Sequence, residues 1–191
     1  MKALLFFLML FFTLPVFSQD DDDENECGSN RWDVKTLTDE NASDVILTAK
    51  SSTIKKQKEF DPQVIGKKTP RLEDEKQVYK IKCYLIGFLT EKDQDRHLII
   101  VSSNNQDTMV AEICDPTCPN LQNSKVYNKL VTVRNKFDTY FANKKSNKDI
   151  RLHIQIEGVG FYDLKHGRNP KGNPPNNREI HPVTKLTFLS N

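Results

Sequence analysis

From residue 77 onward, apolar and polar positions alternate in a way that predicts a mostly β protein. Gln77–Thr90 forms a long β-candidate, and two further strands are expected over residues 96–103 and 107–113. Charged or Ser/Asn-rich segments separate them, as is typical of turns. The apolar face of the first strand holds Tyr79, Ile81, Cys83 and Leu85.

The period then changes, which predicts one helix followed by two more strands. Apolar residues recur every three or four positions between 126 and 141, so this segment is expected to bury one face of an amphipathic helix. Alternation returns over residues 149–161, and residues 184–189 read as a closing strand. The helical stripe consists of Val126, Leu130, Val133, Phe137 and Phe141.

This order of elements, β-β-β-α-β-β, is that of the OB-fold, a five-stranded Greek-key barrel. Gly87, Gly158 and Gly160 fall within the expected strands, where glycines allow the bends of barrel corners. The alternative is an open α+β sheet covered by one helix. The predicted domain is therefore an OB-like barrel over residues 77–191.

Residues 27–76 are polar and irregular, and we expect them to form an arm laid over the barrel. Two short stretches, 32–37 and 45–51, have β-like composition, and Trp32 is the expected anchor of the arm.

Residues 1–18 read as a cleavable signal peptide, with Lys2 before an apolar run that is too short to cross a bilayer. Residues 19–26, QDDDDENE, then form an acidic leader that is expected to stay solvated. No later segment is a transmembrane candidate. The chain is thus predicted to be secreted or periplasmic.

Four cysteines, Cys27, Cys83, Cys114 and Cys118, are candidates for disulfides because export exposes them to an oxidising compartment. The spacing does not choose a pairing. Cys118 or Cys114 can tie down Cys27, or these two can pair with each other. Cys83 lies on an apolar strand face, where a buried free thiol is the alternative.

Candidate chemistry gathers in two loops, residues 91–97 and 163–181, which in an OB-fold flank the ligand face. Imidazoles with carboxylates suit a divalent metal ion such as zinc or manganese, so His97, His166 and His181 are candidate ligands. The alternative is a long loop fixed by its own polar side chains. The expected ligand-binding rim consists of Asp93, Asp95, His97, Asp163, His166, Glu179 and His181.

Several segments together resemble a recurrent set of bacterial exported single-domain proteins of unassigned function. The resemblance implies one exported domain and names no reaction. This chain departs from the pattern at residues 168–171. The matching pieces are Cys27–Thr36, Asp95–Leu98, Met109–Ile113, Asp115–Cys118, Gly158–Asp163, His166–Gly167 and Glu179–Val183.

Charge favours a binding function. Beyond residue 26 the chain has 27 basic and 20 acidic residues, a net charge of +7, which suits an anionic ligand of small or polymeric kind. A metal-assisted hydrolase of nuclease or esterase type, using the same rim, is the alternative, although the chain has no HExxH, GxSxG or P-loop motif. A structural or interaction domain is the third possibility.

Overall fold

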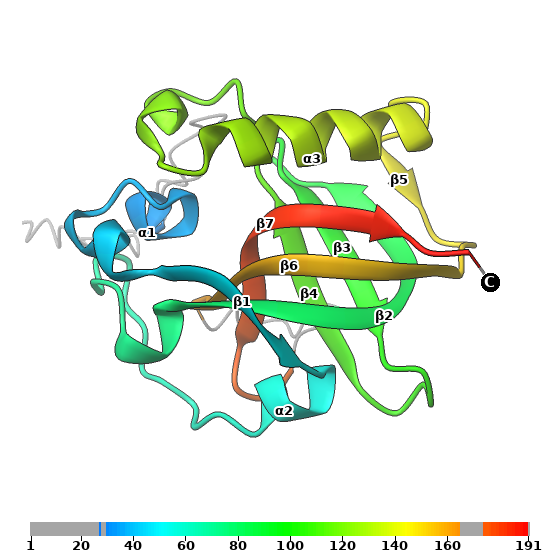
Figure 1. Ribbon diagram of the computed structural model, residues 1–191, viewed down its shortest axis with the longest axis horizontal. Coiled ribbons are helices and arrows are strands. Elements are labelled where there is room, and N and C mark those ends of the chain that lie inside the picture. The colour runs from blue at the N-terminus through cyan, green and yellow to red at the C-terminus, as the bar shows by residue number, and fades with distance from the viewer. Residues whose placement is uncertain (1–26, 28–29, 165–173, 191) are drawn as a thin grey trace, which may run out of the picture.

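The computed structural model describes residue 27, residues 30–164 and residues 174–190. Five strands form a closed barrel: β2 (Gln77–Thr90), β3 (Arg96–Val101), β4 (Thr108–Ile113), β6 (Leu152–Tyr162) and β7 (Arg178–Phe188). They pair in the order β2-β3-β4-β7-β6, and β6 returns to β2 (Figure 1). This confirms the predicted OB-fold-like barrel. The expected signal peptide and acidic leader lie outside the described residues.

The barrel closes because β2 is long enough to serve two neighbours. Its residues 78–85 pair with β6, and residues 84–90 pair with β3. The β2–β3 register shifts between Leu85 and Gly87, which is the bend expected at this glycine. β4 and β7 pair in parallel, and the remaining neighbours in the barrel are antiparallel.

Two glycines in β6 let it approach β7 very closely. A Cβ on Gly158 would lie 2.6 Å from the carbonyl oxygen of Pro182 and would also collide with Ile180. A Cβ on Gly160 would collide with the Arg178 guanidinium. The register between the two strands shifts at both positions. These glycines are therefore required by close packing at the barrel corner.

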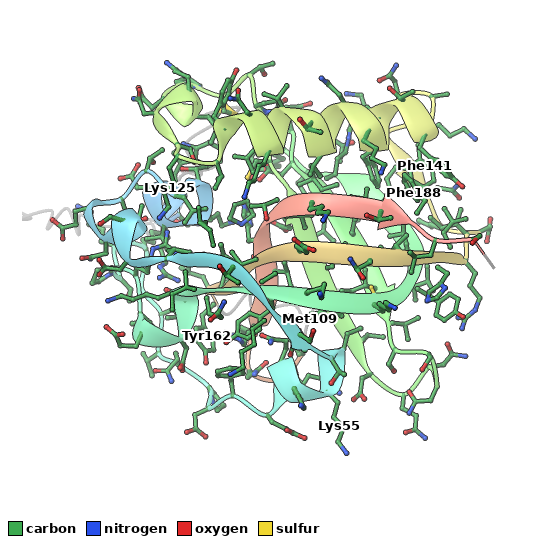
Figure 2. The ribbon with its side chains drawn as sticks, viewed as in Figure 1. Lys55, Met109, Lys125, Phe141, Tyr162 and Phe188 are labelled. Atoms are coloured by element: carbon green, nitrogen blue, oxygen red, sulfur yellow. A yellow bond between two sulfur atoms is a disulfide. The ribbon has the colours of Figure 1, made fainter. Side chains whose placement is uncertain are left out.

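Helix α3 (Tyr127–Tyr140) lies across one end of the barrel and confirms the predicted amphipathic segment (Figure 1). Its Phe137 ring meets that of Phe88 from β2 at 4.9 Å, edge to face. Phe141 and Phe188 lie close to each other where the helix ends and β7 leaves the barrel (Figure 2). The short elements η3 (Leu121–Asn123) and β5 (Ser146–Asn147) flank the helix.

The arm is more regular than the sequence suggests. It contains α1 (Trp32–Thr36), η1 (Glu40–Asp44), β1 (Ile46–Ser52), α2 (Ile54–Lys58) and η2 (Glu73–Glu75). β1 confirms the expected stretch at 45–51 and pairs in parallel with β2. The strand expected at 32–37 is wrong, because this segment forms the helix α1.

Buried arginines, rather than Trp32, anchor the arm. The guanidinium of Arg31 donates to both carboxylate oxygens of Glu75, at 2.9 and 2.6 Å, and to the carbonyl of Tyr162. Arg71 pairs with Asp39 in the same two-pronged way. Trp32 is only half-buried. The segment becomes helical because these contacts position it, which local composition did not reveal.

The last strand is longer than expected. The closing strand was predicted over 184–189, but β7 begins at Arg178. Residues 178–183 contain charged side chains and a proline, so they read as loop in the sequence. They are nevertheless buried strand, because their polar side chains meet partners from other elements.

One disulfide joins the arm to the barrel. Cys27 is bonded to Cys118, 91 residues later, while Cys83 and Cys114 are buried free thiols. The pairing of Cys27 and the alternative for Cys83 are thus confirmed. No helix among residues 27, 30–164 and 174–190 is long and apolar enough to cross a bilayer.

Candidate functional site

A polar cluster lies on the outer face of the barrel wall formed by β3, β4 and β7. His97 on β3 is directly opposite Glu112 on β4, and Ala111 is opposite Ile180 on β7. Because side chains alternate along a strand, Glu112 comes beside Glu179 and His181, while Ala111 and Ile180 belong to the core. In OB-folds the corresponding outer face is the ligand face.

Glu112 is the centre of this cluster. Its Oε1 lies 2.9 Å from Nδ1 of His97, and its Oε2 lies 2.8 Å from Nδ1 of His181. Nδ1 of His181 is also 3.4 Å from Oε1 of Glu179. Glu91, the first residue of the turn that joins β2 to β3, approaches the same His97 nitrogen at 3.1 Å. All but Glu91 are buried.

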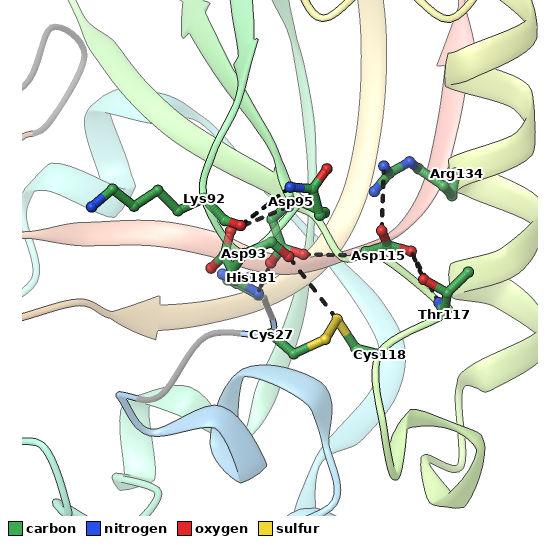
Figure 3. Close-up of a disulfide and its surroundings, with 10 residues drawn as sticks. Cys27, Lys92, Asp93, Asp95, Asp115, Thr117, Cys118, Arg134 and His181 are labelled. Carbon is green, nitrogen blue, oxygen red and sulfur yellow. Dashed lines mark hydrogen bonds and ion pairs between the residues drawn. A yellow bond between two sulfur atoms is a disulfide. The ribbon is translucent and has the colours of Figure 1, made fainter. Parts of the chain in front are cut away.

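The other side of the His181 ring faces a second pair of residues. Nε2 lies 3.5 Å from Oδ2 of Asp95 and 3.4 Å from the sulfur of Cys114. Asp95 is itself held in place, since its Oδ1 accepts the backbone N–H of Asp115 at 2.7 Å. Figure 3 shows Asp93, Asp95 and His181 beside the Cys27–Cys118 disulfide.

The arm covers the cluster. Lys35 on α1 places its ammonium 4.0 Å from Oε2 of Glu112 and 3.9 Å from Oδ1 of Asp163. The Phe161 ring lies beneath the arm, with the Arg31 guanidinium 4.7 Å and the Lys35 ammonium 5.8 Å from its centre. α1 therefore turns an outer barrel face into an enclosed polar site.

Burial and neighbouring charges shift the acids in opposite directions. Burial raises the pKa of Asp95 to about 8 and that of Glu179 to about 7. Burial also acts on Glu112, but Lys35 and the two histidines outweigh it and hold the pKa of Glu112 well below its usual value. Burial lowers the pKa of His97, yet hydrogen bonds to Glu112 and Glu91 raise it to about 10.

Three atoms of the cluster converge without hydrogen bonds. Within the described part of the chain, Oε2 of Glu112, Oε1 of Glu179 and Nδ1 of His181 are buried and have no hydrogen-bond partner, and the same holds for Oδ2 of Asp95 on the other side of the ring. Leaving a buried polar group unsatisfied costs about 1–3 kcal/mol. Such a set requires an explanation, and a bound ion is one. The atoms of Glu112, Glu179 and His181 all lie within 4.8 Å of one another.

The structure brings together four of the expected site residues: Asp95, His97, Glu179 and His181. Glu179 and His181 lie on β7 rather than in a loop, and His97 is on β3, which corrects the expected loop rim. Asp93 shapes the turn by accepting the N–H of Asp95. Asp163 lies beside Lys35, and His166 is outside the described residues.

Sequence reasoning missed the two residues on which the cluster depends, Glu112 and Lys35. Glu112 is the only charged residue in the strand Thr108–Ile113, and an isolated charge in a buried strand is a usable signal.

Comparison with known proteins found no relative of this chain. No protein-family model matches the chain, and neither the curated proteins nor the solved structures contain a match.

Proposed function

We propose that this chain is an exported binding domain whose outer barrel face holds a divalent transition-metal ion through Glu112, Glu179 and His181. The observation that carries the proposal is the convergence of three buried ligand atoms that make no hydrogen bonds in the described chain. Nδ1 of His181 lies 2.8 Å from one carboxylate oxygen and 3.4 Å from the other. Ligands bound about 2.0–2.2 Å from one ion have comparable separations.

The residues around these ligands have the arrangement that supports metal sites. A metal-binding histidine usually donates its second ring N–H to an acceptor, and here Nε2 of His181 contacts the sulfur of Cys114 at 3.4 Å and faces Oδ2 of Asp95 at 3.5 Å. The non-ligating oxygen of Glu112 is held by His97. His181 and Glu112 are therefore both contacted on the side that faces away from the proposed ion.

The charge of the cluster favours a cation as its first ligand. Carboxyl groups outnumber the cationic side chains among the residues in contact, and burial makes unneutralised carboxylates costly. One imidazole with two carboxylates suits zinc or manganese. The net charge of +7 led us to expect an anionic ligand, and we propose that this ligand binds after the metal ion.

Calorimetric titration of metal-stripped protein with Zn²⁺ and Mn²⁺ tests the proposal. The wild type should bind one ion, and Glu179→Gln and His181→Gln should each lose at least about 100-fold in affinity, more than is typical of residues that only support ligands. His153→Gln is the matched control, because His153 lies near the start of β6, where its ring stacks on Tyr84 and contacts none of the proposed ligands. Failure of the wild type to bind either ion would overturn the proposal.

Export is the second part of the proposal. The Cys27–Cys118 disulfide supports an oxidising destination. Expression of the full-length chain with a C-terminal tag, followed by N-terminal sequencing of the secreted or periplasmic product, tests it. A start near Gln19 is expected, and retention of Met1 in the cytoplasmic fraction would contradict it.

A further inference from the structure

The ammonium of Lys35 is close to the proposed metal ligands but bonded to none of them. Its nearest carboxylate oxygens are 3.9 and 4.0 Å away, beyond hydrogen-bond length, and in the described chain no hydrogen bond of Lys35 Nζ is present. One of these oxygens, Oε2 of Glu112, is a proposed metal ligand. The two contacts are therefore ion pairs without a hydrogen bond, and the ammonium retains its capacity to donate to a further oxygen atom.

We propose that Lys35 binds an anionic oxygen of a ligand carried on the metal ion, a phosphate or a carboxylate group. The inference rests on the proposed metal site. An ion bound to Glu112 and Glu179 would neutralise the two acids, and within the described chain Asp163 is then the remaining carboxylate within 4 Å of the Lys35 ammonium. An oxyanion on the metal gains a charge-assisted hydrogen bond from the ammonium.

The position of Lys35 in the fold supports a role in binding. It is the residue through which α1 reaches the cluster, and α1 follows directly on Arg31, which is fixed to Glu75. The ammonium is thereby held at one place over the barrel wall. A pre-positioned cation favours an anionic ligand, because it costs no reorganisation when the negative charge arrives.

The experiment uses zinc-loaded protein from which free zinc has been removed, titrated calorimetrically with inorganic phosphate and, in a second arm, with acetate. The loaded wild type should bind at least one of the two anions, and the arm that succeeds identifies the class. Lys35→Met and Lys35→Gln should weaken this binding by about 10-fold or more, while Lys35→Arg retains it. Lys55→Met is the matched control, because Lys55 is exposed and points away from the barrel (Figure 2).

The outcomes separate the two proposals. If the wild-type protein does not bind zinc, the metal site itself is overturned. If the wild type binds zinc but no anion, only the role of Lys35 is overturned. The same holds if the wild type and both neutral Lys35 variants bind the anion with equal affinity. Zinc affinity of the Lys35 variants within about threefold of wild type, together with unchanged far-ultraviolet circular dichroism, confirms that the site is otherwise intact.

Discussion

Glu112 shares its carboxylate between two histidines, with one oxygen 2.9 Å from Nδ1 of His97 and the other 2.8 Å from Nδ1 of His181. The two contacts differ in kind. The first is a hydrogen bond, whereas the second is an ion-pair contact without hydrogen-bond geometry. His97 therefore orients Glu112, while Nδ1 of His181 and the second carboxylate oxygen converge on the position proposed for the ion.

This difference predicts graded effects on metal affinity. His97→Gln and Asp95→Asn remove groups that orient a ligand without being ligands, so each should weaken zinc binding by about 10–100-fold rather than abolish it. Competition with a chromogenic chelator gives the affinities. Affinities equal to that of wild type would show that neither residue supports the site.

The close approach of β6 to β7 predicts a large cost for a single methyl group. Gly158→Ala should lower the free energy of unfolding by about 2 kcal/mol or more, because the new Cβ would lie 2.6 Å from a backbone oxygen that cannot move aside. Chemical denaturation measures the change. Gly66→Ala is the control, since its Cβ would meet only Thr69 at 3.6 Å and should change stability little.

The two free thiols should be inert in the folded protein. Burial raises the pKa of Cys83 to about 12 and, as the largest effect on it, that of Cys114 to about 11, so little reactive thiolate exists at neutral pH. Reaction of the native protein with an aromatic disulfide reagent should release no thiolate chromophore. After unfolding in urea, the protein should release two equivalents of it. Four equivalents without reductant would contradict the Cys27–Cys118 bond.

A pair of arginines should make stability depend on pH through Asp138. Although burial acts to raise its pKa, hydrogen bonds from Arg96 and Arg134 hold the pKa of Asp138 below its usual value. A carboxylate of lowered pKa stabilises the fold above its unfolded pKa and loses this contribution as pH falls. Asp138→Asn should cost about 1–2 kcal/mol at pH 7.

The cost of Asp138→Asn should shrink as pH falls below about 4, because the carboxyl of the unfolded chain is protonated near its usual pKa of about 3.9 while the folded one, with its lowered pKa, is protonated only at still lower pH. Urea unfolding across this range provides the measurement. Asp149→Asn, at an exposed position, should show no such trend. A cost that stays constant with pH would remove the ionic explanation.

The barrel was predictable because β2, β3, β4 and α3 each repeat apolar residues at their own period over a complete element. The first half of β7 was not, since it mixes buried charged side chains with a proline, and its pairing with β6 and the side-chain partners of Glu179 and His181 are not visible in the sequence. α1 is five residues long and owes its shape to Arg31 contacts with distant residues. The expected site residues were largely right in type, but the isolated charge of Glu112 was overlooked, and Lys35 reaches the cluster only because distant contacts position α1.

That register also determines which parts of the domain are free to change. The groups that would coordinate the ion come from neighbouring strands of one wall, fixed by backbone pairing of His97 with Glu112 and of Ala111 with Ile180. None of the three proposed ligands comes from a segment that joins two strands. Connecting segments that supply no supporting group can therefore be exchanged while the metal chemistry stays the same, so new ligand preferences can arise on this barrel by replacing such segments.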